Sequence, residues 1–401
     1  MRPIPHGGNS AGVRRRLGLG EAPLLDFSTS LNPLGPPPRA LAAARDALNG
    51  ADRYPELGAP RLTERLAERH GVPVDRVIVG AGTTELIGLI AQSLREVLAL
   101  HALQRGDPMM PVSHLVEPTY GEYRRVSVLN ELRTEAWGGH VLGWTQEGFP
   151  SNAAGVFWTG HPNNPTGRVW ERKALLESID ASLGLLTVVD EAFLPFLPDE
   201  EQQSLVSAVP ERENLLVLRS LTKIHALPGL RVGYAVASAD MVTRLRQYQD
   251  PWTITGAAEA AALEALDDRE HGDRTVRFVA EEATRVEERL WDIPGLRPAW
   301  PERDRPGDAH PLPNFLLVSL IETAWTAPQV HDALALRGIL VRECSDFAGL
   351  EVGALLTGPD QLVATQGHLR IGLRGRADND RLLAALRDVL ASEPPGASPL
   401  T

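Results

Sequence analysis

Residues 215–223 read Leu-Leu-Val-Leu-Arg-Ser-Leu-Thr-Lys, and this stretch decides both the fold and the chemistry that we predict. The apolar run is too short for a stable helix and is typical of a strand buried inside a parallel sheet. It ends in hydroxyl side chains and Lys223. We therefore predict a central strand that presents Lys223 at the carboxyl edge of the sheet, where open α/β sheets bind ligands.

Two further buried strands are predicted before this one. Residues 155–160 (Gly-Val-Phe-Trp-Thr-Gly) lead to Asn164, and residues 185–189 (Leu-Leu-Thr-Val-Val) lead directly to Asp190. Strand and helix patterns alternate through this half of the chain, which indicates a mostly parallel sheet with helices on both faces. We expect Asn164, Asp190 and Lys223 to converge at one edge of that sheet, where parallel strands end together.

The three side chains differ in chemistry. A lysine among apolar residues loses its proton more easily than one in water, so Lys223 is a candidate for forming a Schiff base. A buried carboxylate such as Asp190 needs a partner. Asn164 precedes a proline, which holds it extended and lets its amide point at one fixed acceptor. A surface lysine and a plain turn are the ordinary alternatives for Lys223 and Asn164.

Two groups of donors suit a phosphate. Thr83 and Thr84 stand at the predicted start of a helix, where free backbone N–H groups form an anion site. The preceding Gly80-x-Gly82 pair lacks the third glycine of a dinucleotide-binding fingerprint, so we reject that interpretation. Hydroxyl and guanidinium donors also surround Lys223 in the sequence, at Ser220, Thr222 and Arg231.

Together these groups match one ligand, pyridoxal phosphate. The chain supplies an amine for the aldehyde, an acid for the ring nitrogen, an amide for the ring oxygen and donors for the phosphate. Tyr120 follows a predicted strand and is placed to stack on the ring, with a core tyrosine as the alternative. The sequence therefore predicts a site for this cofactor.

The length of the chain predicts two domains, because 401 residues exceed what one hydrophobic core usually supports. We expect an N-terminal arm with part of the small domain at 1–50, the large domain at 51–255, and the C-terminal small domain at 256–401. The polar stretch at 101–111, broken by Gly and Pro, predicts a loop.

Charge and cysteine content limit the function classes. Forty basic and 52 acidic residues give a net charge of −12, which argues against a general binder of nucleic acid or of anionic membranes. The single cysteine, Cys344, excludes an internal disulfide and a cysteine-based zinc site. We expect no metal, no membrane span and a cytoplasmic location.

The motifs of the chain resemble those of the aspartate-aminotransferase-like (fold type I) pyridoxal-phosphate enzymes, from residue 6 to about residue 390. The resemblance is carried by Asn-Pro-Thr-Gly at 164–167, Asp-Glu-Ala at 190–192 and Ser-x-x-Lys at 220–223 with Arg231. It implies an α/β fold, with a large domain around a mostly parallel sheet and a smaller α+β domain. A narrower resemblance, to the threonine-phosphate decarboxylases of cobalamin biosynthesis, is carried by segments 6–9, 26–28, 32–37, 219–223 and 338–347.

The resemblance also implies roles for individual residues. Lys223 would bind the cofactor covalently, Asp190 would pair with the ring nitrogen, Asn164 with the ring oxygen, and Tyr120 would stack. Tyr54 resembles a tyrosine that this family lends to its partner subunit, which implies a homodimer with shared active sites. The phosphate of the cofactor would be held by Thr83, Thr84, Ser220, Thr222 and Arg231, and a small phosphorylated amino acid by His6, Asn32, Arg342 (phosphate) and Arg370 (carboxylate).

Three functions follow from the resemblance. The first is decarboxylation of L-threonine O-3-phosphate to (R)-1-aminopropan-2-yl phosphate and CO2 for the cobalamin nucleotide loop, and the second is transamination of histidinol phosphate or a related amino acid. A catalytically silent binding protein is the third, and Lys223 and Asp190 argue against it. Phe193 stands where many aminotransferases have tyrosine, which favours the decarboxylase, whereas Thr255 departs from the decarboxylase pattern. Further departures are Ile224 and His225, and the insertions predicted at 99–112 and 352–367.

Overall fold

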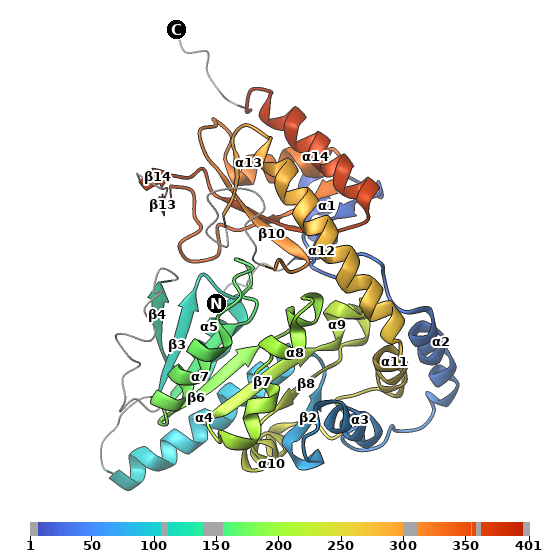
Figure 1. Ribbon diagram of the computed structural model, residues 1–401, viewed down its shortest axis with the longest axis vertical. Helices are drawn as coiled ribbons and strands as arrows, with labels where there is room; N and C mark the ends of the chain where they lie inside the picture. Colours follow the sequence, from blue (N-terminus) through green and yellow to red (C-terminus); the bar gives the residue numbers. More distant parts are fainter. Residues whose placement is uncertain are drawn as a thin grey trace. The chain divides into compact units, whose positions relative to one another are not determined.

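The structure is a computed structural model that describes residues 7–105, 111–138, 155–299, 311–353, 355–357 and 362–395. It forms two compact units (Figure 1). The boundary after Arg274 falls inside helix α12 (Arg269–Trp291). The small unit comprises Met1–Leu34, Asn164–Arg168 and Thr275–Thr401, and the large unit comprises Gly35–Asn163 and Val169–Arg274.

A seven-stranded sheet forms the centre of the large unit, in the order β2-β8-β7-β6-β5-β3-β4. Strands β4, β3, β5, β6 and β7 are mutually parallel, and β8 runs antiparallel to both β2 and β7. The predicted mostly parallel sheet is therefore confirmed. The strands are β2 (Val77–Gly80), β3 (Val112–Glu117), β4 (Arg133–Gly138), β5 (Gly155–Gly160), β6 (Leu185–Asp190), β7 (Leu215–Ser220) and β8 (Gly233–Val236).

Both faces of this sheet are buried, because alternate residues of each strand face opposite sides. Val217 packs in one apolar cluster with residues of α3, α7 and α11, whereas its neighbours Leu216 and Leu218 pack in a second cluster with residues of α4, α5 and α10. This arrangement explains why β7 is apolar throughout its first four residues. The helices are α3 (Pro60–His70), α4 (Thr83–Arg105), α5 (Gly121–Leu129), α7 (Arg172–Ala181), α10 (Ala239–Tyr248) and α11 (Gly256–Asp267).

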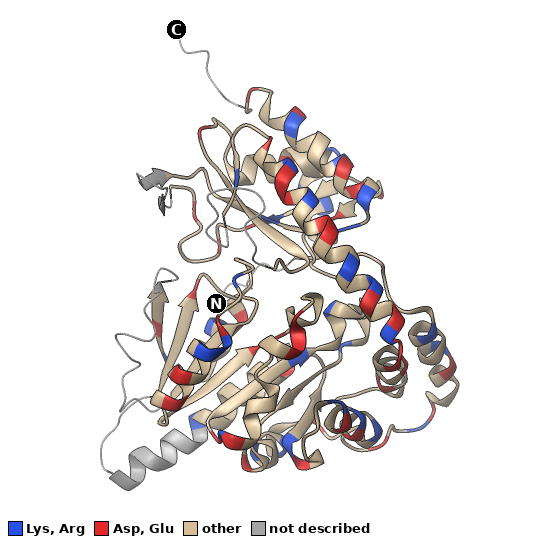
Figure 2. Ribbon diagram, in the orientation of Figure 1, with Lys and Arg blue, Asp and Glu red and all other residues tan. Residues whose placement is uncertain are grey.

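Shorter elements complete the large unit. Helix α2 packs against α11 through small side chains, including Ala40 and Ala261. Charged residues lie mostly on the helices, and the strands of the sheet carry few of them (Figure 2). The remaining elements are α2 (Pro38–Ala47), α8 (Glu200–Gln203), α9 (Leu221–Ile224) and the 3-10 helices Leu48–Gly50, Val74–Arg76, Leu194–Phe196, Val206–Glu211 and Pro228–Leu230.

The small unit is built on a four-stranded antiparallel sheet in the order β12-β15-β10-β9. A parallel pair joins β1 to β11, and β13 pairs antiparallel with β14. Helices α13 and α14 pack against each other. The elements are α1 (Ser10–Leu17), β1 (Leu25–Asp26), β9 (Leu296–Pro298), β10 (Phe315–Leu320), α13 (Ala327–Leu336), β11 (Ile339–Leu340), β12 (Arg342–Glu343), β13 (Leu355–Thr357), β14 (Leu362–Ala364), β15 (His368–Gly372) and α14 (Arg376–Leu390).

Two local predictions need correction. The loop predicted at 101–111 is wrong in its first part, because α4 continues to Arg105. Its Gly and Pro residues at 106 and 108 come after that point, and the preceding Ala, Leu, Gln and Arg residues are good helix formers. The strand predicted to present Lys223 ends at Ser220, and Lys223 lies beyond it in the single turn of α9, a helical turn that was not predicted.

The large unit of the structure is longer than the large domain predicted at 51–255. Residues 35–50 and 256–274 belong to the large unit, and residues 164–168 to the small one.

None of the described helices is both long enough and apolar enough to cross a membrane.

Candidate active site

Lys223 lies in the single helical turn that follows β7. Ser220 caps this turn, since its hydroxyl oxygen accepts a hydrogen bond from the backbone N–H of Thr222 at 3.3 Å. The hydroxyl oxygens of Ser220 and Thr222 are 2.8 Å apart. The Nζ of Lys223 lies 5.7 Å from the centroid of the Phe193 ring. The end of β7 thus brings an amine and two hydroxyls together beside an apolar ring.

Asp190 ends the neighbouring strand β6 and is 8% exposed. Its Oδ2 accepts a hydrogen bond from the hydroxyl of Tyr123 at 2.8 Å, and its Oδ1 accepts one from the backbone N–H of Ala192 at 2.9 Å. Burial raises the pKa of Asp190, while these two hydrogen bonds and the positive charge of Lys223 lower it. Asp190 is therefore buried with two hydrogen-bond donors on its carboxylate, and the charge of Lys223 acts on it.

Tyr120 precedes helix α5 and is confined by its neighbours. Its hydroxyl oxygen is 3.4 Å from the Oγ1 of Thr84, and burial raises its pKa. Its ring meets the ring of Tyr123 edge to face, with centroids 5.6 Å apart. Sequence reasoning missed Tyr123. Its position three residues after Tyr120, in the first turn of α5, was the signal that could have found it.

Arg231, one of the predicted phosphate donors, lies near the start of α4, which begins at Thr83 as expected. Gly82 has a φ of +81°, and a Cβ on it would lie 2.5 Å from Nη2 of Arg231. A Cβ on Gly233 would lie 3.0 Å from both the backbone nitrogen of Thr83 and the backbone oxygen of Arg219. These two glycines therefore allow Arg231 and the end of β7 to approach the first N–H groups of α4.

The large unit therefore fits pyridoxal phosphate in its set of donors and acceptors. It places an amine, a buried acid with a raised pKa and an aromatic side chain within one region, because the charge of Lys223 lowers the pKa of Asp190 and the charge of Asp190 raises the pKa of Tyr120. Arg231 is part of the same region, because its charge lowers the pKa of Tyr120. The backbone N–H groups and hydroxyls at the start of α4 and at α9 suit a phosphate dianion.

Asn164 belongs to the small unit, where it contacts another predicted site residue. Its Oδ1 accepts a hydrogen bond from Nη1 of Arg370. The Nη2 of the same guanidinium donates to the backbone oxygen of Ser28 at 2.8 Å, and the guanidinium lies 5.5 Å from the ring centroid of Phe315. Arg370 therefore turns the amide of Asn164 so that its Nδ2 is the group that can donate to an acceptor.

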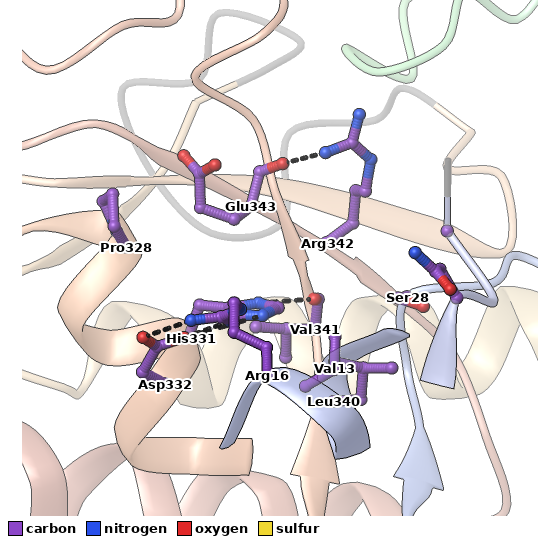
Figure 3. Close-up of a pocket in the computed structure, with 12 residues that line it drawn as sticks. Val13, Arg16, Ser28, Pro328, His331, Asp332, Leu340, Val341, Arg342 and Glu343 are labelled. Carbon is purple, nitrogen blue, oxygen red and sulfur yellow. Dashed lines mark hydrogen bonds and ion pairs between the residues drawn. The ribbon is translucent and has the colours of Figure 1, made fainter. Parts of the chain in front are cut away.

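Arg342 is 8% exposed and is held by an acid that sequence reasoning missed. Its Nη2 lies 2.7 Å from both carboxylate oxygens of Asp346, and its Nη1 donates to the backbone oxygen of Glu343. Arg342 also lines a cavity of about 310 Å³ in the small unit. Figure 3 shows its guanidinium directed away from the ion pair of Arg16 and Asp332 on the opposite side of that cavity.

The remaining predicted residues differ in their surroundings. Asn32 is 5% exposed and has protein partners on both groups of its amide: Nδ2 donates to Thr275 Oγ1 at 2.8 Å, and Oδ1 accepts from the N–H of Leu34. Tyr54 is 81% exposed, with its ring centroid 4.7 Å from that of Trp252. His6 lies outside the described residues.

Comparison with known proteins gives matches along nearly the whole chain. The sequence profile of the aminotransferase class I and II family matches residues 22–386. Threonine-phosphate decarboxylase of Salmonella typhimurium is 32% identical over 399 residues, which cover 97% of this chain and 98% of that protein. Histidinol-phosphate aminotransferase of Symbiobacterium thermophilum is 34% identical over 399 residues, which cover 97% and 96% respectively.

A solved structure gives the same fold. The L-threonine-O-3-phosphate decarboxylase of Porphyromonas gingivalis aligns with a TM-score of 0.75 at 23% sequence identity, covering 91% of this chain and 99% of that one. The predicted aspartate-aminotransferase-like architecture is confirmed. Proteins with two different named activities, a decarboxylase and an aminotransferase, are thus similar to the chain to nearly the same degree.

Proposed function

The chain belongs to the aminotransferase class I and II family, whose cofactor is pyridoxal 5'-phosphate, and on this premise we propose that it is a threonine-phosphate decarboxylase. The substrate is L-threonine O-3-phosphate, and the products are (R)-1-aminopropan-2-yl phosphate and CO2, for the nucleotide loop of cobalamin. The Salmonella typhimurium relative supports this reaction through its name and its coverage of the chain.

The proposal rests on one observation, the apolar ring of Phe193 close to the amine of Lys223. The ring of Phe193 lies 5.7 Å from this amine and brings no hydroxyl to this position. Many aminotransferases of this fold have a tyrosine here, so the apolar ring favours the decarboxylase.

When bound, the cofactor supplies an aldehyde that captures the substrate amine and a ring that accepts electrons from the bond broken at the α-carbon. We propose that Asp190 pairs with the ring nitrogen and keeps a proton there, helped by the hydrogen bonds that stabilise its charged form. Lys223 binds the cofactor covalently and then moves protons with its amine. Tyr120 stacks on the ring.

The phosphate of the cofactor has its own set of donors in this proposal. Thr83 and Thr84 supply backbone N–H and hydroxyl groups at the start of α4, and Arg231 supplies the compensating positive charge. Ser220 and Thr222 add hydroxyls from the end of β7.

The described substrate residues in this proposal, Asn32, Arg342 and Arg370, belong to the small unit. Arg370 binds the substrate carboxylate, and Arg342 binds its phosphate, with His6 and Asn32 nearby. Which bond breaks depends on which one stands perpendicular to the cofactor ring, so the residue that fixes the carboxylate directs the reaction. Arg370 suits this role because Ser28 and Asn164 hold its guanidinium in place.

Transamination of histidinol phosphate is the second candidate, because the Symbiobacterium thermophilum relative is equally similar. The purified protein with bound cofactor distinguishes the two. One sample receives L-threonine O-3-phosphate and is assayed for CO2; another receives histidinol phosphate with 2-oxoglutarate and is assayed for glutamate. We expect CO2 in the first sample and little glutamate in the second. Glutamate without CO2 would contradict the decarboxylase proposal.

We also propose a homodimer in which Tyr54 completes the site of the partner subunit. The exposed pair of Tyr54 and Trp252 forms an aromatic surface that suits a subunit interface. Mixing inactive Lys223→Ala protein with Tyr54→Ala protein produces mixed dimers that contain one intact site. Activity should reappear on mixing, and its absence despite subunit exchange would reject shared sites. A cytoplasmic location remains a proposal that accompanies this function.

A further inference from the structure

The hydroxyl of Tyr123 lies 2.8 Å from Oδ2 of Asp190, and the two residues are 2% and 8% exposed. We propose that Tyr123 is a positioning residue for the cofactor: its hydrogen bond orients the Asp190 carboxylate and sets how strongly that carboxylate attracts the proton of the cofactor's ring nitrogen. This inference rests on the proposed pairing of Asp190 with the ring nitrogen.

The direction of this hydrogen bond follows from the chemistry of the pair. Burial, and next the negative charge of Asp190, raise the pKa of Tyr123 well above its ordinary value, so the phenol keeps its proton and donates it. The carboxylate is the acceptor. A second donor, the backbone N–H of Ala192, binds the other carboxylate oxygen at 2.9 Å. Both donors stabilise the charged form of Asp190 and oppose its protonation.

The ring of Tyr123 is fixed on two sides. It stacks on the ring of Trp158 with centroids 5.3 Å apart and planes 10° apart, and it meets the ring of Tyr120 at 87°. Trp158 is fully buried and donates from its indole nitrogen to Ser113 at 3.1 Å. A phenol held in this way keeps its hydroxyl at one place, so it orients the carboxylate as well as binding it.

Among the described residues, the titratable groups that interact with Asp190 include Tyr123 from α5, Lys223 from α9 and the adjacent Tyr120. Without the Tyr123 hydroxyl, the carboxylate binds a proton more strongly and competes with the ring nitrogen for it. A ring nitrogen that loses its proton draws electrons less strongly from the α-carbon, so the chemical step slows while substrate binding does not change.

The test compares three variants of the 401-residue chain. Tyr123→Phe removes only the hydroxyl and keeps the ring that packs on Trp158. Tyr234→Phe is the matched control, because Tyr234 is also buried but its hydroxyl lies 2.7 Å from Nε2 of His70. Asp190→Asn is the reference for losing the acid itself. Three quantities are measured for each variant. The first is the dissociation constant of the cofactor, obtained by adding it to cofactor-free protein. The others are the pH titration of the visible absorption of the cofactor-bound protein, and kcat with KM.

We expect Tyr123→Phe to move the midpoint of the absorption titration to higher pH, because a less charged ring repels the proton on the Lys223 nitrogen less strongly. Asp190→Asn should move it further in the same direction, and Tyr234→Phe should match the wild type. We also expect Tyr123→Phe to lower kcat about tenfold and to change KM less than about twofold, which is the size of one lost hydrogen bond to a charged group.

Two outcomes separate this inference from the proposal on which it rests. An unchanged titration and cofactor affinity in Asp190→Asn would reject the pairing of Asp190 with the ring nitrogen. A shift in Asp190→Asn together with wild-type behaviour in Tyr123→Phe would reject only the role of Tyr123. Should Tyr123→Phe fail to fold, 3-fluorotyrosine at position 123 keeps the hydroxyl and makes it a stronger donor. The midpoint should then move to lower pH, and a midpoint equal to that of the wild type would overturn the inference.

Discussion

Arg370 donates a hydrogen bond from Nη1 to the amide oxygen of Asn164. The residue proposed to bind the substrate carboxylate thus holds the residue proposed to bind the cofactor ring oxygen. Its other terminal nitrogen, Nη2, is bound to the backbone oxygen of Ser28. Because a guanidinium is a rigid fork, both contacts depend on the same planar group.

Replacing Arg370 with lysine tests this double role. An ammonium cannot reproduce the fork, so we expect Arg370→Lys to lower kcat/KM at least about a hundredfold and to weaken cofactor binding as the amide of Asn164 loses its donor. Arg374→Lys, at an arginine whose Nε binds Asp378 at 3.0 Å, is the control and should change both quantities little. Equal effects of the two substitutions on kcat/KM and on cofactor binding would reject the double role proposed for Arg370.

Asp346 binds the guanidinium of Arg342, the residue that we propose binds the substrate phosphate. Both of its carboxylate oxygens lie 2.7 Å from the guanidinium, so a substrate phosphate has to displace an acid that already binds there. We expect Asp346→Asn to lower KM for L-threonine O-3-phosphate, and Arg342→Gln to raise it far more than for unphosphorylated threonine. A rise in KM in Asp346→Asn would mean that the acid orients Arg342 and does not compete with the phosphate.

Gly82 allows Arg231 to approach the start of α4. We expect Gly82→Ala to weaken cofactor binding at least about tenfold, because its Cβ would lie 2.5 Å from Nη2 of Arg231. Gly71→Ala is a matched control: Gly71 also has a positive φ, +63°, but a Cβ there meets nothing within 4 Å. Both substitutions cost about 1 kcal/mol of stability from the backbone conformation. Similar cofactor affinities in the two variants would contradict the role given to Gly82.

The buried acid also makes stability depend on pH. Burial raises the pKa of Asp190 in the folded protein above the ordinary value of 3.8, so the unfolded chain loses this proton at a lower pH than the folded protein. The contribution of Asp190 to the free energy of unfolding therefore falls as the pH rises from about 4 through the folded pKa. Cofactor-free Asp190→Asn should be more stable than the wild type by about 1 kcal/mol at pH 7, and by less at pH 4.

Denaturant unfolding of the cofactor-free proteins at the two pH values measures this difference. Asp52→Asn serves as the control, because the side chain of Asp52 is 81% exposed. A loss of stability in Asp190→Asn at pH 7 would contradict this prediction. It would show that the hydrogen bonds from Tyr123 and Ala192 and the charge of Lys223 offset the cost of burying the charged carboxylate.

Local sequence patterns were sufficient to predict the two strands that end at Asp190 and just before Lys223. The apolar run of β7 and its hydroxyl-rich end located Lys223, and the apolar run of β6 located Asp190. The contacts between distant residues were not predictable in this way. Tyr123 is 67 positions from Asp190, and Arg370 is 206 positions from Asn164. Such pairs depend on how α5 packs on the sheet and how β15 is placed in the small unit, which short patterns do not contain.

The central claim is that Lys223 binds the cofactor, and the composition of the chain makes a direct test simple. Only two lysines occur among the 401 residues, Lys173 and Lys223. Lys173 is exposed and pairs with Glu177 at 3.7 Å, so it is an internal control. Borohydride reduction of the protein with bound pyridoxal phosphate, followed by peptide mass spectrometry, locates the attached group. We predict modification of Lys223 with Lys173 unmodified; modification of Lys173 alone, or of neither lysine in protein that retains the cofactor, would contradict the account.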